Sequence, residues 1–128
     1  MGRYERSRFV VAILGGVIPQ HPDRDQIQLE NVLAALGNPM RLAVVRALAE
    51  GGEHACGTVL SKEISKSTLT HHWRVLRDSG VIWQRPSGRE NLLSLRREDL
   101  NARFPGLLDA VLNGVSSAPQ SVDQYAAH

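Results

Sequence analysis

The stretch of residues 65–95, SKSTLTHHWRVLRDSGVIWQRPSGRENLLSL, constrains the fold more than any other part of the chain. Leu69, Trp73 and Leu76 recur at the spacing of one helical face, which indicates a helix packed on a core. A second face of the same helix carries hydroxyl, imidazole and guanidinium groups, from Ser67, Thr70, His71 and Arg74. These side chains bond to phosphates and base edges, so the pattern predicts a helix that binds nucleic acid.

Capping and turn residues mark the ends of this helix and the segment after it. Ser65 is a suitable N-cap and Gly80 can adopt the left-handed conformation that ends a helix, so we expect a helix over residues 66–79. Two short strands follow, residues 81–85 and 91–95, joined by a Pro-Ser-Gly turn with an arginine on either side. Helix, glycine, strand, basic turn and strand form the layout of a winged helix-turn-helix, whose second helix enters a major groove.

Three segments, LGNPMRLAVVRAL, SKSTLTHHWRVLRDSGVI and RPSGRENLLSL, resemble the ArsR-type family of bacterial winged-helix repressors. The resemblance covers about two-thirds of the chain, residues 29–112. Members of this family are homodimeric transcription factors, and many release DNA when a metal ion or an oxidant binds. The resemblance therefore implies a mainly α fold with a small β-hairpin (α+β), and a cytoplasmic homodimer that represses transcription from a palindromic operator. Trp73 departs from the family, where a smaller Leu or Phe is more usual, although its spacing still indicates a core residue.

The candidate DNA-binding residues lie on the helix and on the wing, residues 85–90. On the helix, the residues expected to read DNA are Lys66, Ser67, Thr68, Thr70, His71 and Arg74, and Arg77 is expected to contact the phosphate backbone. On the wing, the expected contacts come from Arg85, Ser87, Gly88 and Arg89. The resemblance also implies that His72 is half-buried against the preceding helix.

Charge is distributed unevenly along the chain. Residues 62–103 carry nine Lys/Arg and five Asp/Glu, net +4, whereas residues 1–61 are neutral and residues 104–128 carry net −2. Concentrated positive charge suits a surface that faces phosphates. A solvated basic face is the structural alternative, and a winged-helix module that binds a protein instead of DNA is the functional one.

Two apolar stripes at helical spacing flank the motif. The first predicts an amphipathic helix over residues 29–36, and the second runs from Phe104 to Val115. Together they predict a dimer interface formed by Leu29, Val32, Leu33, Phe104, Leu107, Leu108, Val111 and Leu112. A C-terminal helix that closes the chain's own core explains the second stripe equally well.

Two further helices are expected between these stripes. Residues 39–50 are apolar on nearly all sides and follow an Asn-Pro start signal, which predicts a central buried helix. Arg41 is one of its two basic exceptions and could reach a phosphate. Residues 54–60 are expected to form the short first helix of the helix-turn-helix, although Gly57 weakens the pattern.

The sequence predicts no enzyme, no cofactor and no metal site. His54 and Cys56 supply two ligands, whereas a soft-metal site needs about three or four Cys or His residues. No set of Ser, His, Asp or Cys residues has the context of a catalytic centre. Cys56, the single cysteine, is expected to be a small buried apolar residue, with a redox-sensing role as the alternative. The effector is therefore left as an oxidant, a small organic molecule or no ligand at all.

At 128 residues the chain is expected to form one domain. We divide it into an N-terminal extension (1–25), a winged helix-turn-helix domain (26–115) and a tail (116–128), with residues 19–25 as a linker. The apolar run of residues 9–18 follows three arginines and is about half of a membrane span. We expect it to pack on the domain or the dimer; an export signal and an over-long translation start are the alternatives, and no membrane association is expected.

Overall fold

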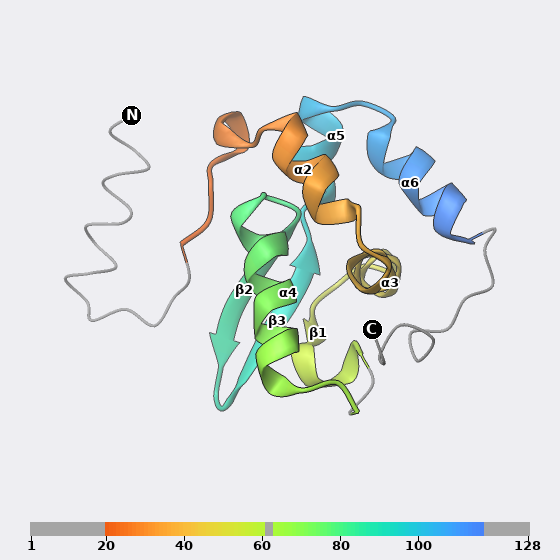
Figure 1. Cartoon of the computed structure of the whole chain (residues 1–128). Coiled ribbons are helices and arrows are strands. Elements are labelled where there is room, and N and C mark those ends of the chain that lie inside the picture. The colour runs from red at the N-terminus through yellow and green to blue at the C-terminus, as the bar shows by residue number, and fades with distance from the viewer. Residues whose placement is uncertain (1–19, 61–62, 117–128) are drawn as a thin grey trace.

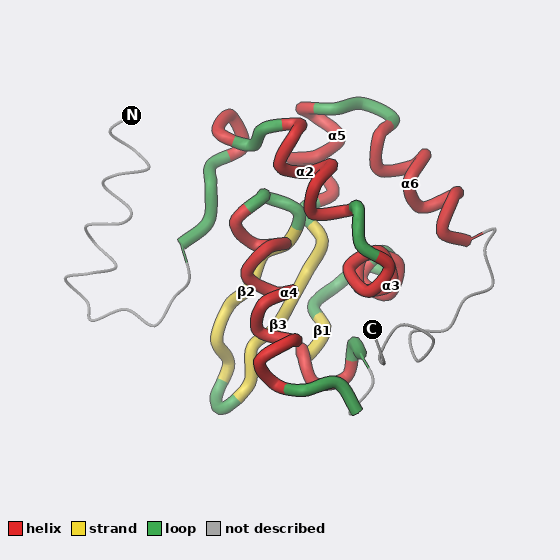
Figure 2. Tube along the Cα trace, viewed as in Figure 1, coloured by secondary structure: helices red, strands yellow, loops and turns green. Residues whose placement is uncertain are grey.

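Helices and a small antiparallel sheet make up the computed structural model of the chain, which describes residues 20–60 and 63–116 (Figure 1). This arrangement confirms the expected α+β winged-helix fold (Figure 2). Within the described residues the elements are, in chain order, the 3-10 helix η1 (Arg24–Gln26), α2 (Leu29–Leu36), α3 (Pro39–Leu48), β1 (His54–Ala55), the 3-10 helix η2 (Cys56–Thr58), α4 (Lys66–Asp78), β2 (Ile82–Ser87), β3 (Glu90–Leu95), α5 (Arg97–Arg103) and α6 (Leu107–Ser116).

Helix α4 begins and ends where its capping residues predict. The hydroxyl oxygen of Ser65 accepts a hydrogen bond from the backbone N–H of Thr68 at 3.2 Å. At the other end Gly80 has φ +89°, and the N–H groups of Gly80 and Val81 donate to the carbonyls of Arg77 and Leu76. These two bonds form a Schellman motif, which requires the left-handed residue that glycine supplies. The cap and the motif together set the length of the helix.

The wing is longer than the sequence predicts, because Pro86 and Ser87 belong to β2 and not to the turn. Ser87 pairs with Glu90, which leaves a two-residue turn whose first residue, Gly88, has φ +64°. The sheet order is β1-β3-β2, so β2 is an edge strand, and an edge strand tolerates proline.

The expected first helix of the motif over residues 54–60 is wrong in its first half. His54 and Ala55 form strand β1, paired with Leu93 and Leu92 of β3, and only the single 3-10 turn of η2 follows. Gly51 and Gly52, with φ +96° and +77°, bring the chain antiparallel to β3. A sheet partner almost forty residues ahead thus takes up the backbone groups that a helix would have used.

The C-terminal stripe is divided between two elements. Phe104 caps α5 and lies outside α6, because Pro105 and Gly106 (φ +86°) interrupt the helix between them. Helix α5 itself was not expected, since Leu100 is its one apolar residue besides an alanine. Leu100 is nevertheless 2% exposed and belongs to the core, which α6 also closes through Leu108.

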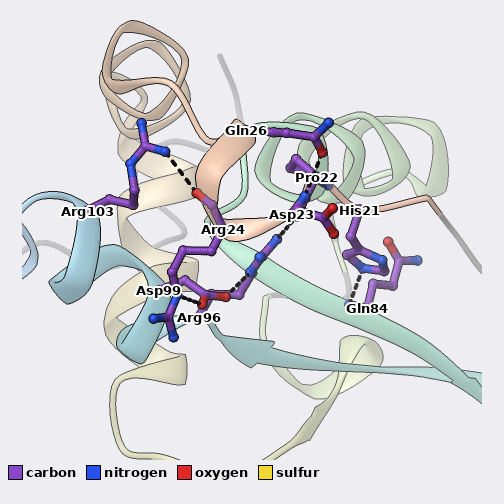
Figure 3. A network of polar contacts seen from close by, with 9 residues as sticks. All are labelled: His21, Pro22, Asp23, Arg24, Gln26, Gln84, Arg96, Asp99 and Arg103. Carbon is purple, nitrogen blue, oxygen red and sulfur yellow. Dashed lines mark hydrogen bonds and ion pairs between the residues drawn. The ribbon is translucent and has the colours of Figure 1, made fainter. Parts of the chain in front are cut away.

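The expected linker is bonded to the domain over its described part, and we call residues 20–27 the N-terminal strap (Figure 3). The side chain of His21 accepts from the backbone N–H of Gln84 on β2 at 3.0 Å. Arg96 donates to the Pro22 carbonyl at 2.8 Å and forms an ion pair with Asp99. The strap is therefore part of the folded unit, and it is hydrogen-bonded to β2, the edge strand of the wing.

The apolar run of residues 9–18 and the tail beyond residue 116 lie outside the described residues. Over the residues that are described, no helix combines the length and the apolar character needed to cross a bilayer.

Candidate nucleic-acid interface

Helix α4 presents one polar face to solvent and one apolar face to the core. Trp73 and Leu76 are 6% and 0% exposed, which confirms both as core residues. The face opposite is exposed throughout, and it consists of the four residues that the sequence singled out, Ser67, Thr70, His71 and Arg74. Helix α4 packs on α2, α3 and β2, so this face is the part of the helix left for a partner.

The basic side chains of α4 and the wing differ in whether they already have a hydrogen-bond or ion-pair partner. In the part of the chain that the structure describes, Lys66, Arg74 and Arg89 make no hydrogen bond or ion pair. Arg77 is half-buried and donates to Gln84 at 3.3 Å, beside an ion pair with Asp78. Three cations are thus available to phosphates without breaking a contact.

Arg85 of the wing is already held by a carboxylate. Its guanidinium donates to both oxygens of Glu53, at 2.5 and 2.8 Å. This hydrogen bonding raises the pKa of Arg85 and lowers the pKa of Glu53. Sequence analysis missed Glu53, because it lies 32 residues from Arg85 and only the pairing of β1 with β3 brings the two segments together.

The N-terminal half of α4 and the tip of the wing lie at the same end of the molecule, the lower end in Figure 1. Thr68 is half-buried, and its hydroxyl accepts from Ser65 at 2.9 Å, so it belongs to the cap as well as to the candidate site. Ser87, Gly88 and Arg89 are exposed at the tip. One side of the molecule therefore offers a helix and a hairpin together.

A groove extends this surface from α4 toward the start of α3. It is lined on the α4 side by Ser67, Thr68 and His71, and on the α3 side by Asn38 and Arg41. The guanidinium of Arg41 does not simply point outward, since its Nε donates to the carbonyl of Ala35 at 2.6 Å. Its Nη1 lies 3.1 Å from Nδ1 of His72, which is 6% exposed. His72 is thus more deeply buried than expected, and its ring contacts Arg41 of α3.

Comparison with known proteins agrees with this geometry. A family model described as a helix-turn-helix domain matches residues 36–85, from the end of α2 through most of β2. The uncharacterized HTH-type transcriptional regulator YceK of Bacillus subtilis (strain 168) is 35% identical over 89 residues, 68% of this chain and 88% of that protein. The arsenical resistance operon repressor of Staphylococcus xylosus is 30% identical over 74 residues, 58% of this chain and 71% of that protein. The chain belongs to the ArsR-type family of helix-turn-helix transcriptional regulators.

A solved structure supports the same assignment. The transcriptional repressor BigR from Xylella fastidiosa superimposes on this chain with a TM-score of 0.52 and 29% identity, covering 66% of this chain and 83% of that one. The names of these relatives are those of transcriptional regulators and not of enzymes. In this ArsR-type regulator, α4 is therefore the second helix of the helix-turn-helix and the β2–β3 hairpin is the wing.

The residues expected at a dimer interface of this ArsR-type chain fall into three groups. Leu29 and Leu33 of α2 are 43% and 48% exposed, so both present apolar surface to solvent. Val32 and Leu108 are 0% and 1% exposed, so they belong to the core of the single chain and offer no surface to a partner. The others are half-buried against that core: Phe104, Leu107, Val111 and Leu112.

The single thiol lies beside β3, the inner strand of the wing. Cys56 is half-buried and packs against the core at the start of η2, which contacts β3. His54 is held by a contact of 3.0 Å between its Nε2 and the carbonyl of Gly51. Among the described residues, no three His, Cys, Asp or Glu side chains gather closely enough to hold a metal ion.

Proposed function

We propose that this regulator is a cytoplasmic homodimeric repressor that binds a palindromic operator through α4 and the wing. The observation that carries the proposal is the division of α4 into a buried apolar face and an exposed face of Ser67, Thr70, His71 and Arg74. A helix of this kind, presented beside a hairpin, fits the major groove while the hairpin reaches the neighbouring backbone.

Different parts of the surface have different tasks. Thr70 and His71 lie in the middle of the exposed face of α4, where side chains reach base edges. Lys66, at the first turn of the helix, and Arg89, at the wing tip, are unpaired cations suited to phosphates. Base contacts give sequence preference, whereas phosphate contacts add affinity for any sequence.

The exposed leucines of α2 support the homodimer in this proposal. Leu29 and Leu33 lie one helical turn apart on α2, so they form one apolar strip on the surface of the single chain. Phe104, Leu107, Val111 and Leu112 add half-buried apolar surface at the C-terminal end of the domain. A second copy of the chain would cover these side chains and place a second α4 for the other half of a palindrome.

The experiment compares single variants on two DNA probes. The probes are a duplex selected by the wild-type protein from a random pool and a duplex of unrelated sequence. Thr70→Ala or His71→Ala should reduce the discrimination between them by about 1–3 kcal/mol if each residue contacts a base. Arg89→Ala should weaken binding to both probes alike. If His71→Ala also weakened both probes alike, the assignment of the reading face would be wrong.

A further inference from the structure

A short chain of hydrogen bonds joins the reading helix to the two helices behind it. Arg41 of α3 contacts the carbonyl of Ala35 on α2 at 2.6 Å and Nδ1 of His72 on α4 at 3.1 Å. An arginine guanidinium has N–H donors only and stays protonated, so Arg41 must be the donor in both contacts. It follows that Nδ1 of His72 accepts, and that a neutral His72 carries its proton on Nε2.

The surroundings of His72 oppose a second proton on its ring. A proton on Nδ1 would remove the acceptor and place two cations 3.1 Å apart in a site where His72 is 6% exposed. His71, on the same helix, is the next titratable neighbour, with ring centroids 5.7 Å apart, and Glu63 lines the same groove. Burial, the charge of Arg41 and the charge of His71, in that order, lower the pKa of His72 below its ordinary value of 6.5.

We propose that Arg41 is the positioning residue of the reading helix, and that it holds α4 in the DNA-binding orientation only while Nδ1 of His72 is unprotonated, so that acidification releases DNA. The inference rests on the proposed function, because it concerns the orientation in which α4 meets DNA. His72 adjoins His71 of the exposed face, so a loss of the Arg41 contact acts at the centre of the interface.

The sign of the effect distinguishes a buried group from an exposed one. When only the protein with neutral His72 binds DNA, its affinity for DNA falls as the pH drops through the lowered pKa of His72. The loss is up to about tenfold in Kd per pH unit. Added positive charge on the exposed face of α4 would instead attract phosphate and strengthen binding. Weaker binding at acid pH is therefore the mark of the buried residue.

The test measures the Kd for a duplex selected at neutral pH, by fluorescence anisotropy from about pH 7.5 down to the lowest pH at which the chain is folded, at constant ionic strength. The variants are His72→Asn, whose Oδ1 stands in the place of Nδ1 and does not titrate, and His54→Asn as a matched control away from α4. The wild type and His54→Asn should lose affinity together as pH falls, while His72→Asn should not lose affinity. Circular dichroism at each pH shows whether the chain is still folded.

A second measurement examines the contact without DNA. Long-range ¹H–¹⁵N correlation spectra of the free protein should show His72 with its proton on Nε2 at neutral pH and a pKa below the ordinary range, and Arg41→Gln should raise that pKa. This titration decides the matter if His72→Asn does not fold. A wild-type affinity that is flat or rises on acidification, a His72→Asn variant that declines as steeply as the wild type, or a proton on Nδ1 would each overturn the inference. Absence of DNA binding at neutral pH would instead contradict the proposed function, and the spectra would still test the contact.

Discussion

Ile27 of the N-terminal strap packs directly over Gly80 at the end of the reading helix. A Cβ on residue 80 would lie 2.5 Å from Cγ1 of Ile27, and Gly80 also has φ +89°. Ile27 is 1% exposed, so its side chain is enclosed by the protein and cannot turn out into solvent. The strap therefore packs so closely on the end of α4 that only glycine fits at position 80.

Gly80→Ala should destabilise the protein by about 2–4 kcal/mol, from the left-handed backbone and from overpacking together. Gly88→Ala is the matched control, since Gly88 has φ +64° with nothing within 4 Å, and it should cost only about 1 kcal/mol. Denaturant unfolding measures both. In an Ile27→Ala background the clash is absent, so Gly80→Ala should then cost no more than the control; an unchanged cost would show that the packing is not its cause.

Asp99 anchors the strap through two arginines. The free energy that its carboxylate contributes to folding should depend on pH. Burial raises the pKa of Asp99, but hydrogen bonds from Arg24 and Arg96 and their charges outweigh it, so the pKa lies below the ordinary 3.8. A lowered carboxyl pKa stabilises the fold above pH 3.8, and the contribution is lost as pH falls through the lowered value.

Asp99→Asn should therefore cost about 3 kcal/mol near neutral pH, because it leaves the buried guanidinium of Arg96 without its anion. Arg24→Gln removes the exposed partner, which is 52% accessible, and should cost less than about 1 kcal/mol. Denaturant midpoints over a range of pH test this. A deficit in Asp99→Asn that persisted unchanged at pH values where wild-type Asp99 is protonated would contradict the ion-pair explanation.

The dimer is tested by two aspartate substitutions at sites of opposite exposure. Leu33→Asp, at a position 48% exposed, should leave helical circular dichroism intact and give a monomer in sedimentation, with DNA affinity reduced because one chain engages one half-site. Leu108→Asp, at a position 1% exposed, should unfold the chain by burying an unpaired charge. A Leu33→Asp protein that remained dimeric would place the interface elsewhere.

The ion pair between Glu53 and Arg85 should keep the guanidinium of Arg85 from contacting DNA phosphates. Glu53→Gln releases Arg85, so affinity for duplex DNA should rise and its salt dependence should steepen by up to about 0.9 in the slope of log K against log salt. Glu90→Gln removes the same charge from the wing without contacting Arg85, and serves as the control. Equal effects of the two variants would mean that Arg85 is not restrained by its partner.

The sequence predicts the reading helix well because the residues that determine this helix all lie within or next to it. The spacing of Leu69, Trp73 and Leu76, the Ser65 cap and Gly80 all act within one element, and each is found in the structure. Exposure of the opposite face follows from the same period. In contrast, β1 depends on a partner strand that lies far ahead in the chain. Periodicity within a short window carries no signal for such a pairing.

The contacts of Arg41 and of the strap could not be predicted from the sequence, for the same physical reason. Arg41 and His72 are 31 residues apart, and the strap meets Arg96 across 74. An isolated arginine in a sequence does not show whether it will face phosphate, carboxylate or a histidine ring. Arg41 was expected to be able to reach a phosphate, whereas the structure commits two of its nitrogens to the protein.

The central claim is that the exposed face of α4 and the wing bind duplex DNA, and a salt titration tests it most directly. Kd for a duplex should rise steeply with salt, with log K falling by about 0.9 for each phosphate neutralised. Arg74→Gln, which removes an unpaired cation from α4, should lower that slope by about one phosphate, whereas Arg46→Gln on α3 should leave it unchanged. Weak binding that does not respond to salt, or equal slopes in all three proteins, would contradict the claim and favour a winged-helix module that binds protein.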